Sequence, residues 1–364
     1  MNHEADHSRQ VIHVDKTKCV NCHACIAACP VKICNDGSGD HVSVNADTCI
    51  GCGRCLATCS HGARYFTDDF AAFLRDVAKP TPIVAVVAPS IVANFSDQYL
   101  QVNGWFQSLG VEAVFDVSFG AELCAQSYAE YICRHRPRLL ISQPCPVVVN
   151  YIQTHQPALL EYLAPVDSPM LHTLKMIRRY YPQFARHRLA VLSPCPAKRR
   201  EFDETGLGDY NLTFASLRDH LSATNTSLAT FPAVDYFTPL PERAVLFPTP
   251  GGLLRTLEKW LPEIRHQARE IHGSDRVCAY LQTLPETLAK YPRSLPQIVD
   301  CLNCEHGCSG GPGAVIRGEP PDEVQHRIET RYRQLREQRA RQACTADHDA
   351  QRFLADFRQE GLYD

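Results

Sequence analysis

Beyond residue 82, short uninterrupted apolar runs alternate with longer stretches in which apolar and polar positions are mixed. Residues 83–88 are apolar throughout, which is typical of a parallel strand buried on both faces. Similar runs predict strands at 113–117, 138–142, 188–192 and 244–247, and the intervening patterns predict helices over about 97–109, 122–135 and 253–261. This alternation of strand and helix predicts an α/β domain, in which sites gather at the carboxyl ends of strands.

The two ends of the chain follow other patterns. Residues 11–14 and 42–44 predict short strands within a segment dense in cysteine, and 68–82 predicts a helical link that ends at Pro80 and Pro82. Residues 322–341 are charged with sparse apolar positions, which predicts an exposed helix or a docking tail. We therefore expect three parts, at 10–70, 83–318 and 319–364, which fits a soft prior of two or three domains for 364 residues.

Composition narrows the class of protein. The formal net charge is −3 with acids and bases interspersed, which argues against a nucleic-acid partner. No apolar run approaches the roughly 20 residues of a membrane span, and the polar N-terminus lacks the apolar core of a secretory signal. Eighteen cysteines in an unexported chain indicate metal ligands or reduced thiols. We expect a cytoplasmic protein of a cell that spends time without oxygen.

Eight of the cysteines lie in two runs with the same spacing, C-x2-C-x2-C-x3-C, at 19–29 and 49–59. Three thiolates on one tight loop can hold three corners of an iron–sulfur cube, and in two-cluster ferredoxins the fourth cysteine of each run ligates the other cluster. The runs therefore predict one [4Fe–4S] cluster at Cys19, Cys22, Cys25 and Cys59 and a second at Cys49, Cys52, Cys55 and Cys29. Disulfides and zinc are weaker interpretations, because zinc sites rarely use four cysteines twice at such spacings.

A second set of cysteines follows in three segments. Cys145 and Cys195 each stand between prolines just after a predicted strand, and Cys304 and Cys308 precede a glycine-rich stretch that lets the backbone approach a bulky cofactor. One cysteine from each of two lobes and two or three from a third loop suit a cluster buried between lobes. Alternatively, Cys145 and Cys195 are ordinary buried thiols, since free cysteine packs like a small hydrophobe.

The remaining cysteines have no such context. We interpret Cys34, Cys124, Cys133 and Cys278 as structural, and the isolated Cys344 as a bystander.

These segments, in this order after a ferredoxin unit, resemble the catalytic domain of the [FeFe]-hydrogenases and their sensory and non-hydrogenase relatives, over about residues 84–313. The family's Thr-Ser-Cys-Cys-Pro is matched at 142–146, its Met-Pro-Cys-x-x-Lys at 193–198, and its Cys-x3-Cys with following glycines at 304–313, with supporting matches at 115–121, 150–160 and 248–252. The resemblance implies an α+β ferredoxin-like domain followed by a two-lobed α/β domain with the cofactor pocket between the lobes.

Carried over residue by residue, the resemblance implies that Cys145, Cys195, Cys304 and Cys308 hold a third [4Fe–4S] cluster. In active hydrogenases the last of these cysteines also bridges to a diiron centre that bears CO and cyanide. The lysine matched by Lys198 hydrogen-bonds a cyanide there, as a fixed ammonium donor can.

The departures from the family pattern are equally informative. Active members have a relay cysteine immediately before the first-loop ligand, where this chain has Pro144, and a pair of glutamates where this chain has Ser127 and Tyr128. Proton transfer needs donors within hydrogen-bond reach of each other, so two links look broken. Ser193 and Leu302 also replace methionines that pack near the diiron site. Cys301 is an added thiol that either carries protons, ligates an altered cluster or has no role.

The resemblance thus leaves several functions open. One is a hydrogenase-type oxidoreductase in which Lys198 and Cys301 serve the reaction, and another is a sensory or low-turnover relative that has lost the relay. A third is an electron carrier with three [4Fe–4S] clusters and no diiron unit. In each case we expect a redox partner protein or subunit, such as a ferredoxin, a flavoprotein or a signalling protein.

Overall fold

A computed structural model describes residues 10–316 and 318–342, and the bystander interpretation of Cys344 lies outside these residues. The N-terminal part forms a small domain in which β1 (Ile12–Val14) pairs antiparallel with β4 (Arg64–Phe66) and β2 (Asn35–Asp36) with β3 (Ser43–Val44). Two short helices, α1 (Ala24–Ala27) and α2 (Arg54–Thr58), contact each other between the strands. The two predicted strands, β1 and β3, are confirmed.

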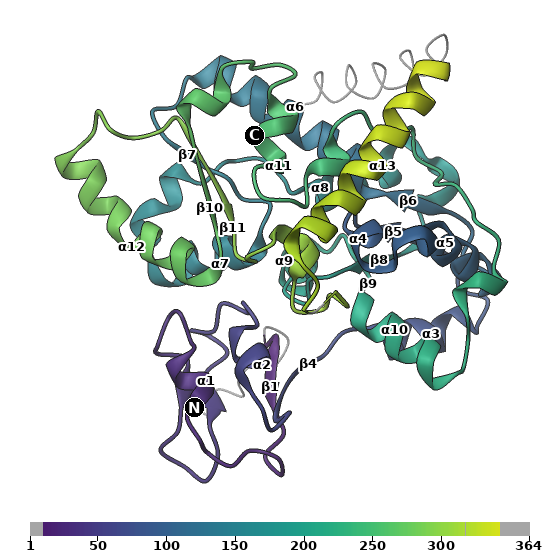
Figure 1. Ribbon diagram of the computed structural model, residues 1–364, viewed down its shortest axis with the longest axis horizontal. Helices are drawn as coiled ribbons and strands as arrows, with labels where there is room; N and C mark the ends of the chain where they lie inside the picture. The colour runs from purple at the N-terminus through teal and green to yellow at the C-terminus, as the bar shows by residue number, and fades with distance from the viewer. Residues whose placement is uncertain (1–9, 317, 343–364) are drawn as a thin grey trace.

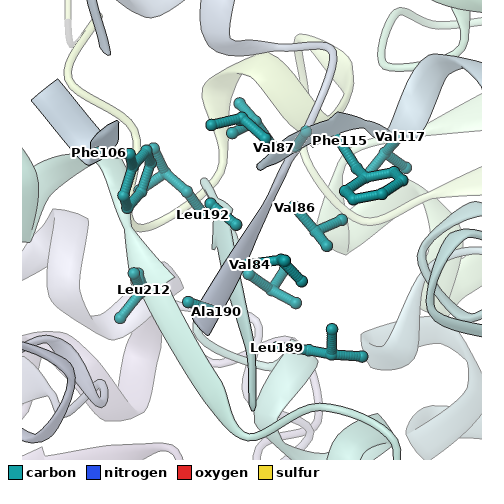
Figure 2. Packing of buried hydrophobic residues seen from close by; sticks show 14 of the residues in the cluster. Val84, Val86, Val87, Phe106, Phe115, Val117, Leu189, Ala190, Leu192 and Leu212 are labelled. Atoms are coloured by element: carbon teal, nitrogen blue, oxygen red, sulfur yellow. The ribbon is translucent and has the colours of Figure 1, made fainter. Parts of the chain in front are cut away.

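The larger part contains two separate parallel sheets (Figure 1). The first has the order β6-β5-β8-β9, formed by β5 (Ile83–Val87), β6 (Val114–Asp116), β8 (Arg188–Ser193) and β9 (Tyr210–Thr213). All five residues of β5 are buried, as its uninterrupted apolar run predicts. Figure 2 shows its valines packed among side chains of β6, β8 and β9.

The second sheet has the order β10-β11-β7, formed by β7 (Leu140–Ile141), β10 (Ala268–His272) and β11 (Ile298–Leu302). α12 (Ser274–Lys290) packs on β10 and β11. The other α-helices are α3 (Phe70–Val77), α4 (Ile91–Phe95), α5 (Tyr99–Ser108), α6 (Val117–His135), α7 (Pro146–His155), α8 (Pro169–Tyr180), α9 (Lys198–Thr205), α10 (Phe214–Ala223), α11 (Gly252–Leu257) and α13 (Pro321–Gln342).

Short 3-10 helices connect these elements: η2 (Ser96–Gln98), η3 (Pro157–Tyr162), η4 (Pro182–Phe184), η5 (Leu228–Thr230), η6 (Ala244–Leu246), η7 (Ile264–Gln267) and η8 (Gly307–Gly310). None of the helices in the described part of the chain is both long and apolar enough to span a bilayer.

The strand predicted at 244–247 is wrong, because η6 occupies this position. Oε1 of the buried Glu122 accepts the backbone N–H groups of Glu242, Arg243 and Ala244 at 2.8, 2.5 and 2.7 Å. These donors are therefore satisfied by a side chain that is remote in sequence, and they are not offered to a neighbouring strand. Burial raises the pKa of Glu122, and the N–H groups oppose that shift.

The charged C-terminal segment also differs from the expected exposed helix. One face of α13 buries Val324, Ile328 and Leu335 against residues of α4 and η6, and α13 crosses the larger part of the molecule in Figure 1. Arg331, only 2% exposed, forms an ion pair with the equally buried Asp116 and lies over the rings of Tyr99 and Tyr236. A buried guanidinium needs such a partner to offset its desolvation, so this part of α13 belongs to the body of the protein.

Candidate functional site

The two N-terminal cysteine runs lie in different surroundings. We call residues 19–25 the outer loop and residues 49–55 the inner loop. The outer loop carries Cys22, which is exposed, beside Val20, which is 61% exposed. The carbonyl of Cys49 in the inner loop accepts N–H groups from Asn150 at 3.1 Å and Arg200 at 2.9 Å, both from the larger part of the protein. The inner loop is therefore held against the larger part.

Cysteines of the predicted inner cluster converge. Cys29, Cys49, Cys52 and Cys55 line one cavity, and a fifth thiol, that of Cys34, lines it with them. The Sγ atoms of Cys29 and Cys34 are 3.2 Å apart. The sequence interpretation of Cys34 as structural overlooked this position. The available signal was its place five residues after Cys29.

A buried arginine lies among the cysteines of the predicted outer cluster. Arg64 at the start of β4 is 6% exposed and donates from Nη2 to Cys25 Sγ at 3.0 Å. Burial raises the pKa of Cys59, but the backbone N–H groups of His61, Ala63 and Arg64 and the charge of Arg64 outweigh it, so the pKa is lowered. The surroundings of Cys59 therefore favour the thiolate, the form that ligates iron. Arg64 was not identified from the sequence.

The donor set fits clusters better than single ions. Among the described residues, no three His, Cys, Asp or Glu side chains come close enough to hold one metal ion. Thiols of the inner loop and of Cys29 line one cavity, which is the kind of donor that a cubane takes. Soft thiolates select iron–sulfur clusters among the metals of proteins.

A second convergence involves the ends of strands from both parallel sheets. Cys145 follows β7 and Cys304 follows β11, while Cys195 follows β8 of the other sheet and Cys308 lies in η8. Backbone contacts join the loops, because Gly313 N–H donates to Pro194 O at 2.9 Å and Cys308 N–H to Pro248 O at 2.7 Å. Gly307 has φ +66°, and a Cβ there would lie 2.2 Å from Pro248 O, so this approach requires glycine.

The electrostatics of these thiols favour the binding of a cation. Burial, together with the charges of Cys145 and Cys195, raises the pKa of Cys308 to about 12. Burial and the charge of Cys145 likewise raise the pKa of Cys195 to about 12. Neighbouring thiols disfavour each other's ionisation, and bound iron removes this penalty because a coordinating thiol is deprotonated outright.

Lys198 lies buried at the start of α9, beside the same loops. Its Nζ donates to Glu201 Oε2 at 2.5 Å and to Pro144 O at 3.3 Å. Burial opposes its charge, but Glu201 and the thiols of Cys195 and Cys308 outweigh this, so the pKa of Lys198 is raised. The ammonium is thus fixed near two of the predicted ligands and against the loop of the first.

Ser127 and Tyr128, at the positions where the resemblance implies relay groups, make structural contacts. Tyr128 is fully buried, and its hydroxyl accepts the N–H of Gln143 at 2.9 Å. Burial raises its pKa well above the ordinary value. Ser127 Oγ lies 3.2 Å from Nε2 of His172, whose Nδ1 lies 3.1 Å from Ser168 O. Burial lowers the pKa of His172, so the ring is neutral and donates from Nδ1.

Cys301 lies inside β11, away from solvent. Burial, followed by the charges of Asp300 and Cys145, raises its pKa well above the ordinary value. Its neighbour Asp300 is 3% exposed, accepts from Ser142 Oγ at 3.3 Å and leaves Oδ2 without a hydrogen bond. Burial raises the pKa of Asp300 to about 7. Asp300 is a buried titratable group that sequence reasoning did not identify.

Asn303 connects the inner loop with the central cysteines, as we call Cys145, Cys195, Cys304 and Cys308. Its Nδ2 lies 3.4 Å from Cys52 O and 3.8 Å from Cys304 Sγ. A single side chain therefore contacts a predicted ligand residue of the inner cluster and a predicted ligand of the central one. Its adjacency to Cys304 was visible in the sequence, but its second contact, across 251 residues, was not.

Two family models match the chain. The model described as "Iron only hydrogenase large subunit, C-terminal domain" matches residues 81–312, and that described as "4Fe-4S dicluster domain" matches residues 11–60.

Solved structures of [FeFe]-hydrogenases are similar in fold to this chain. A structure on stepwise [FeFe]-hydrogenase H-cluster assembly, HydA(deltaEFG), is 16% identical with a TM-score of 0.56, over 72% of this chain and 88% of that one. A variant of [FeFe]-hydrogenase HydA1 from Chlamydomonas reinhardtii is 14% identical with a TM-score of 0.58, over the same shares. At these identities the likeness shows a shared fold.

Proposed function

The chain belongs to the iron-only hydrogenase large subunit family through its C-terminal domain, and we propose on this basis that it is an [FeFe]-hydrogenase-like redox protein. Electrons pass between a buried H-cluster-type centre, at Cys145, Cys195, Cys304 and Cys308, and two ferredoxin clusters. When bound, these clusters supply one-electron chemistry. The observation that carries the proposal is the convergence of the four thiols beside the buried Lys198.

The contacts of the inner loop support an electron path between the inner cluster and the central cysteines. Asn303 contacts both Cys52 O and Cys304 Sγ, so the inner cluster is the neighbour of the central centre. The outer loop carries the exposed Cys22, where a redox partner can approach. A soluble carrier, a flavoprotein or a signalling subunit would meet the protein there. We place this exchange in the cytoplasm of an anaerobic cell.

The loop that carries Pro144 and Cys145 supports a sensory or low-turnover function of the centre. Pro144 has no ionisable group, and its carbonyl accepts from Lys198. The hydroxyl of Tyr128, at a relay position, accepts a backbone N–H and stays protonated because burial raises its pKa. Proton delivery along this side of the centre therefore lacks two of its links.

Lys198 supports the presence of a diiron subsite. An ammonium has three donors, and two of those of Lys198 go to Glu201 and Pro144 O. The third is left for an anionic ligand such as cyanide. The thiols of Cys195 and Cys308 help to keep the ammonium charged.

The alternative is a diiron-free electron-transfer protein with three [4Fe–4S] clusters that serves a partner oxidoreductase. The ion pair between Lys198 and Glu201, whose side chains are 10% and 12% exposed, favours it. In this alternative the lysine balances the charge of a thiolate-ligated cubane and needs no cyanide.

Infrared spectroscopy of anaerobically purified protein separates the two functions. The protein is prepared with and without the machinery that inserts the diiron unit. Our proposal predicts CO and cyanide bands that shift under hydrogen, and a gain of turnover in Pro144→Cys, with Pro146→Ala as the control at the other side of Cys145. Absence of the bands with about twelve irons per chain, from three cubanes, would reject it and support the electron carrier.

A further inference from the structure

We propose that Cys34 is a second ligand position for the inner [4Fe–4S] cluster, able to replace Cys29 as its fourth ligand. The juxtaposition that carries this is a Cys29–Cys34 pair of thiols, 3.2 Å apart, at the wall of one cavity. The inference rests on the dicluster domain and does not depend on the nature of the central centre.

The cavity receives more thiols than a cubane binds. Cys29, Cys34, Cys49, Cys52 and Cys55 all line it, and a [4Fe–4S] cluster takes four cysteine ligands. Cys29 and Cys34 are 5% and 4% exposed, so both side chains lie inside the protein and not in solvent. The three cysteines of the inner loop bind three corners, and two thiols remain for the fourth.

The backbone around Cys34 keeps its thiol in place. Cys34 immediately precedes β2, and its carbonyl accepts the N–H of Asn45 at 2.8 Å, which extends the pairing between β2 and β3. A turn at 31–33, with Lys32 at φ +65°, returns the chain from Cys29 to this position. The amide of Asn35 lies 3.5 Å from Cys34 Sγ. Exchange between the two thiols therefore needs side-chain rotation and no rearrangement of the strands.

The exchange is balanced in atoms and electrons. The bond between iron and Cys29 sulfur breaks as the bond between iron and Cys34 sulfur forms. The proton of the incoming Cys34 thiol moves to the departing Cys29 thiolate, across a contact of 3.2 Å. No oxidant or reductant takes part, and the charge of the cluster is unchanged.

The outer cluster offers an internal control. The residue five positions after Cys29 is Cys34, and the residue five positions after Cys59 is Arg64. At this equivalent place Arg64 donates to Cys25 Sγ at 3.0 Å. A guanidinium cannot bind iron, so the outer cluster has no comparable replacement for Cys59.

The test compares iron content and EPR spectra of Cys29→Ala, Cys59→Ala and the double variant Cys29→Ala/Cys34→Ala, each purified anaerobically. We expect Cys29→Ala to retain the wild-type iron content and inner-cluster signal. We expect Cys59→Ala and the double variant to lose iron. The loss should lie between about one atom, with the signal of a three-iron cluster, and about four atoms, when the whole cluster is lost. Equal loss in Cys29→Ala and the double variant would overturn the inference.

A conservative variant keeps the inference testable if Cys29→Ala does not fold. In Cys29→Ser, exchange predicts an all-thiolate cluster with Cys34 as the fourth ligand, and a resonance Raman spectrum like that of the wild type. A spectrum with an oxygen ligand, unchanged when Cys34→Ser is added, would mean that Cys34 does not reach the iron.

Discussion

The outer and inner loops share one cysteine spacing but differ in the residues that the spacing encloses. Four positions between the cysteines have left-handed backbone: Asn21 and His23 in the outer loop, at φ +53° and +64°, and Gly51 and Gly53 in the inner loop, at +75° and +78°. The spacing thus determines the backbone shape of both loops. The surroundings determine whether a side chain is tolerated there.

The reason for glycine in the inner loop is close packing. A Cβ at Gly53 would lie 2.4 Å from Cγ of Pro312, in the third cysteine loop of the larger part. In the outer loop, Asn21 instead donates to the carbonyls of Gly37 and Gly39 at 3.0 and 2.9 Å, within the small domain. The inner loop therefore has a backbone without side chains where it contacts the central site. The outer loop is stabilised by hydrogen bonds within the small domain.

Gly53→Ala should have the largest effect. An alanine there combines left-handed strain, of about 1–3 kcal/mol, with the clash against Pro312. We expect stability to fall by about 2 kcal/mol or more and the inner cluster to be lost first, as followed by its EPR signal during anaerobic denaturation.

The matched control is His23→Ala, at the equivalent outer position. It already has a side chain at φ +64°, so the change should cost less than about 1 kcal/mol. Equal destabilisation by the two variants would mean that contact with the larger part does not distinguish the loops.

Arg64→Met should have the next largest effect, on the outer cluster. It removes a charge-assisted hydrogen bond to Cys25 Sγ that is worth about 1.5–3 kcal/mol. Because about 1.4 kcal/mol corresponds to 59 mV for one electron, we expect the outer-cluster potential to fall by roughly 60 mV in an EPR-monitored titration. Arg64→Lys, which keeps the charge, should shift it less. A larger fall at the inner cluster would contradict the assignment.

Asn303→Leu should act on the inner and central clusters alone. The amide is neutral and its contacts with Cys52 O and Cys304 Sγ are long, at 3.4 and 3.8 Å. A weak hydrogen bond of about 0.5 kcal/mol corresponds to roughly 20 mV, so small shifts of that size are expected. A shift of the outer cluster in the same titration would show that the variant disturbs the whole protein.

Asn21→Gly should have the smallest effect. Glycine relieves the strain at φ +53° but loses the bonds to Gly37 O and Gly39 O, so the two contributions nearly cancel. We expect a change in stability below about 0.5 kcal/mol. A loss above about 1 kcal/mol would mean that the Asn21 side chain, more than the loop backbone, supports the outer cluster.

Local patterns were sufficient to predict much of this architecture. The apolar run at 83–88 predicted β5, and the prolines and glycines around Cys145, Cys195 and Cys304 predicted loops at strand ends. These features depend on neighbours in sequence, through the period of the apolar positions and the backbone preferences of proline and glycine.

The error at 244–247 and the omission of Arg64 and Asn303 share a different cause. The 244–247 segment became η6 because Glu122, 120–122 residues earlier, binds the N–H groups of Glu242, Arg243 and Ala244 where η6 begins. Arg64 and Asn303 owe their roles to contacts across 39 and 251 residues. Such contacts exist only after the fold brings distant segments together, so no local sequence pattern predicts them.

The most direct test of the account is EPR spectroscopy of the fully reduced protein, because the account requires the inner cluster to neighbour a third cluster at the central cysteines. We predict that the inner-cluster signal is broadened by a third spin in the wild type. The broadening should disappear in Cys304→Ala, remain in Cys133→Ala, which changes an exposed cysteine, and leave the outer-cluster signal unaltered. An inner-cluster signal identical in wild type and Cys304→Ala would contradict the account.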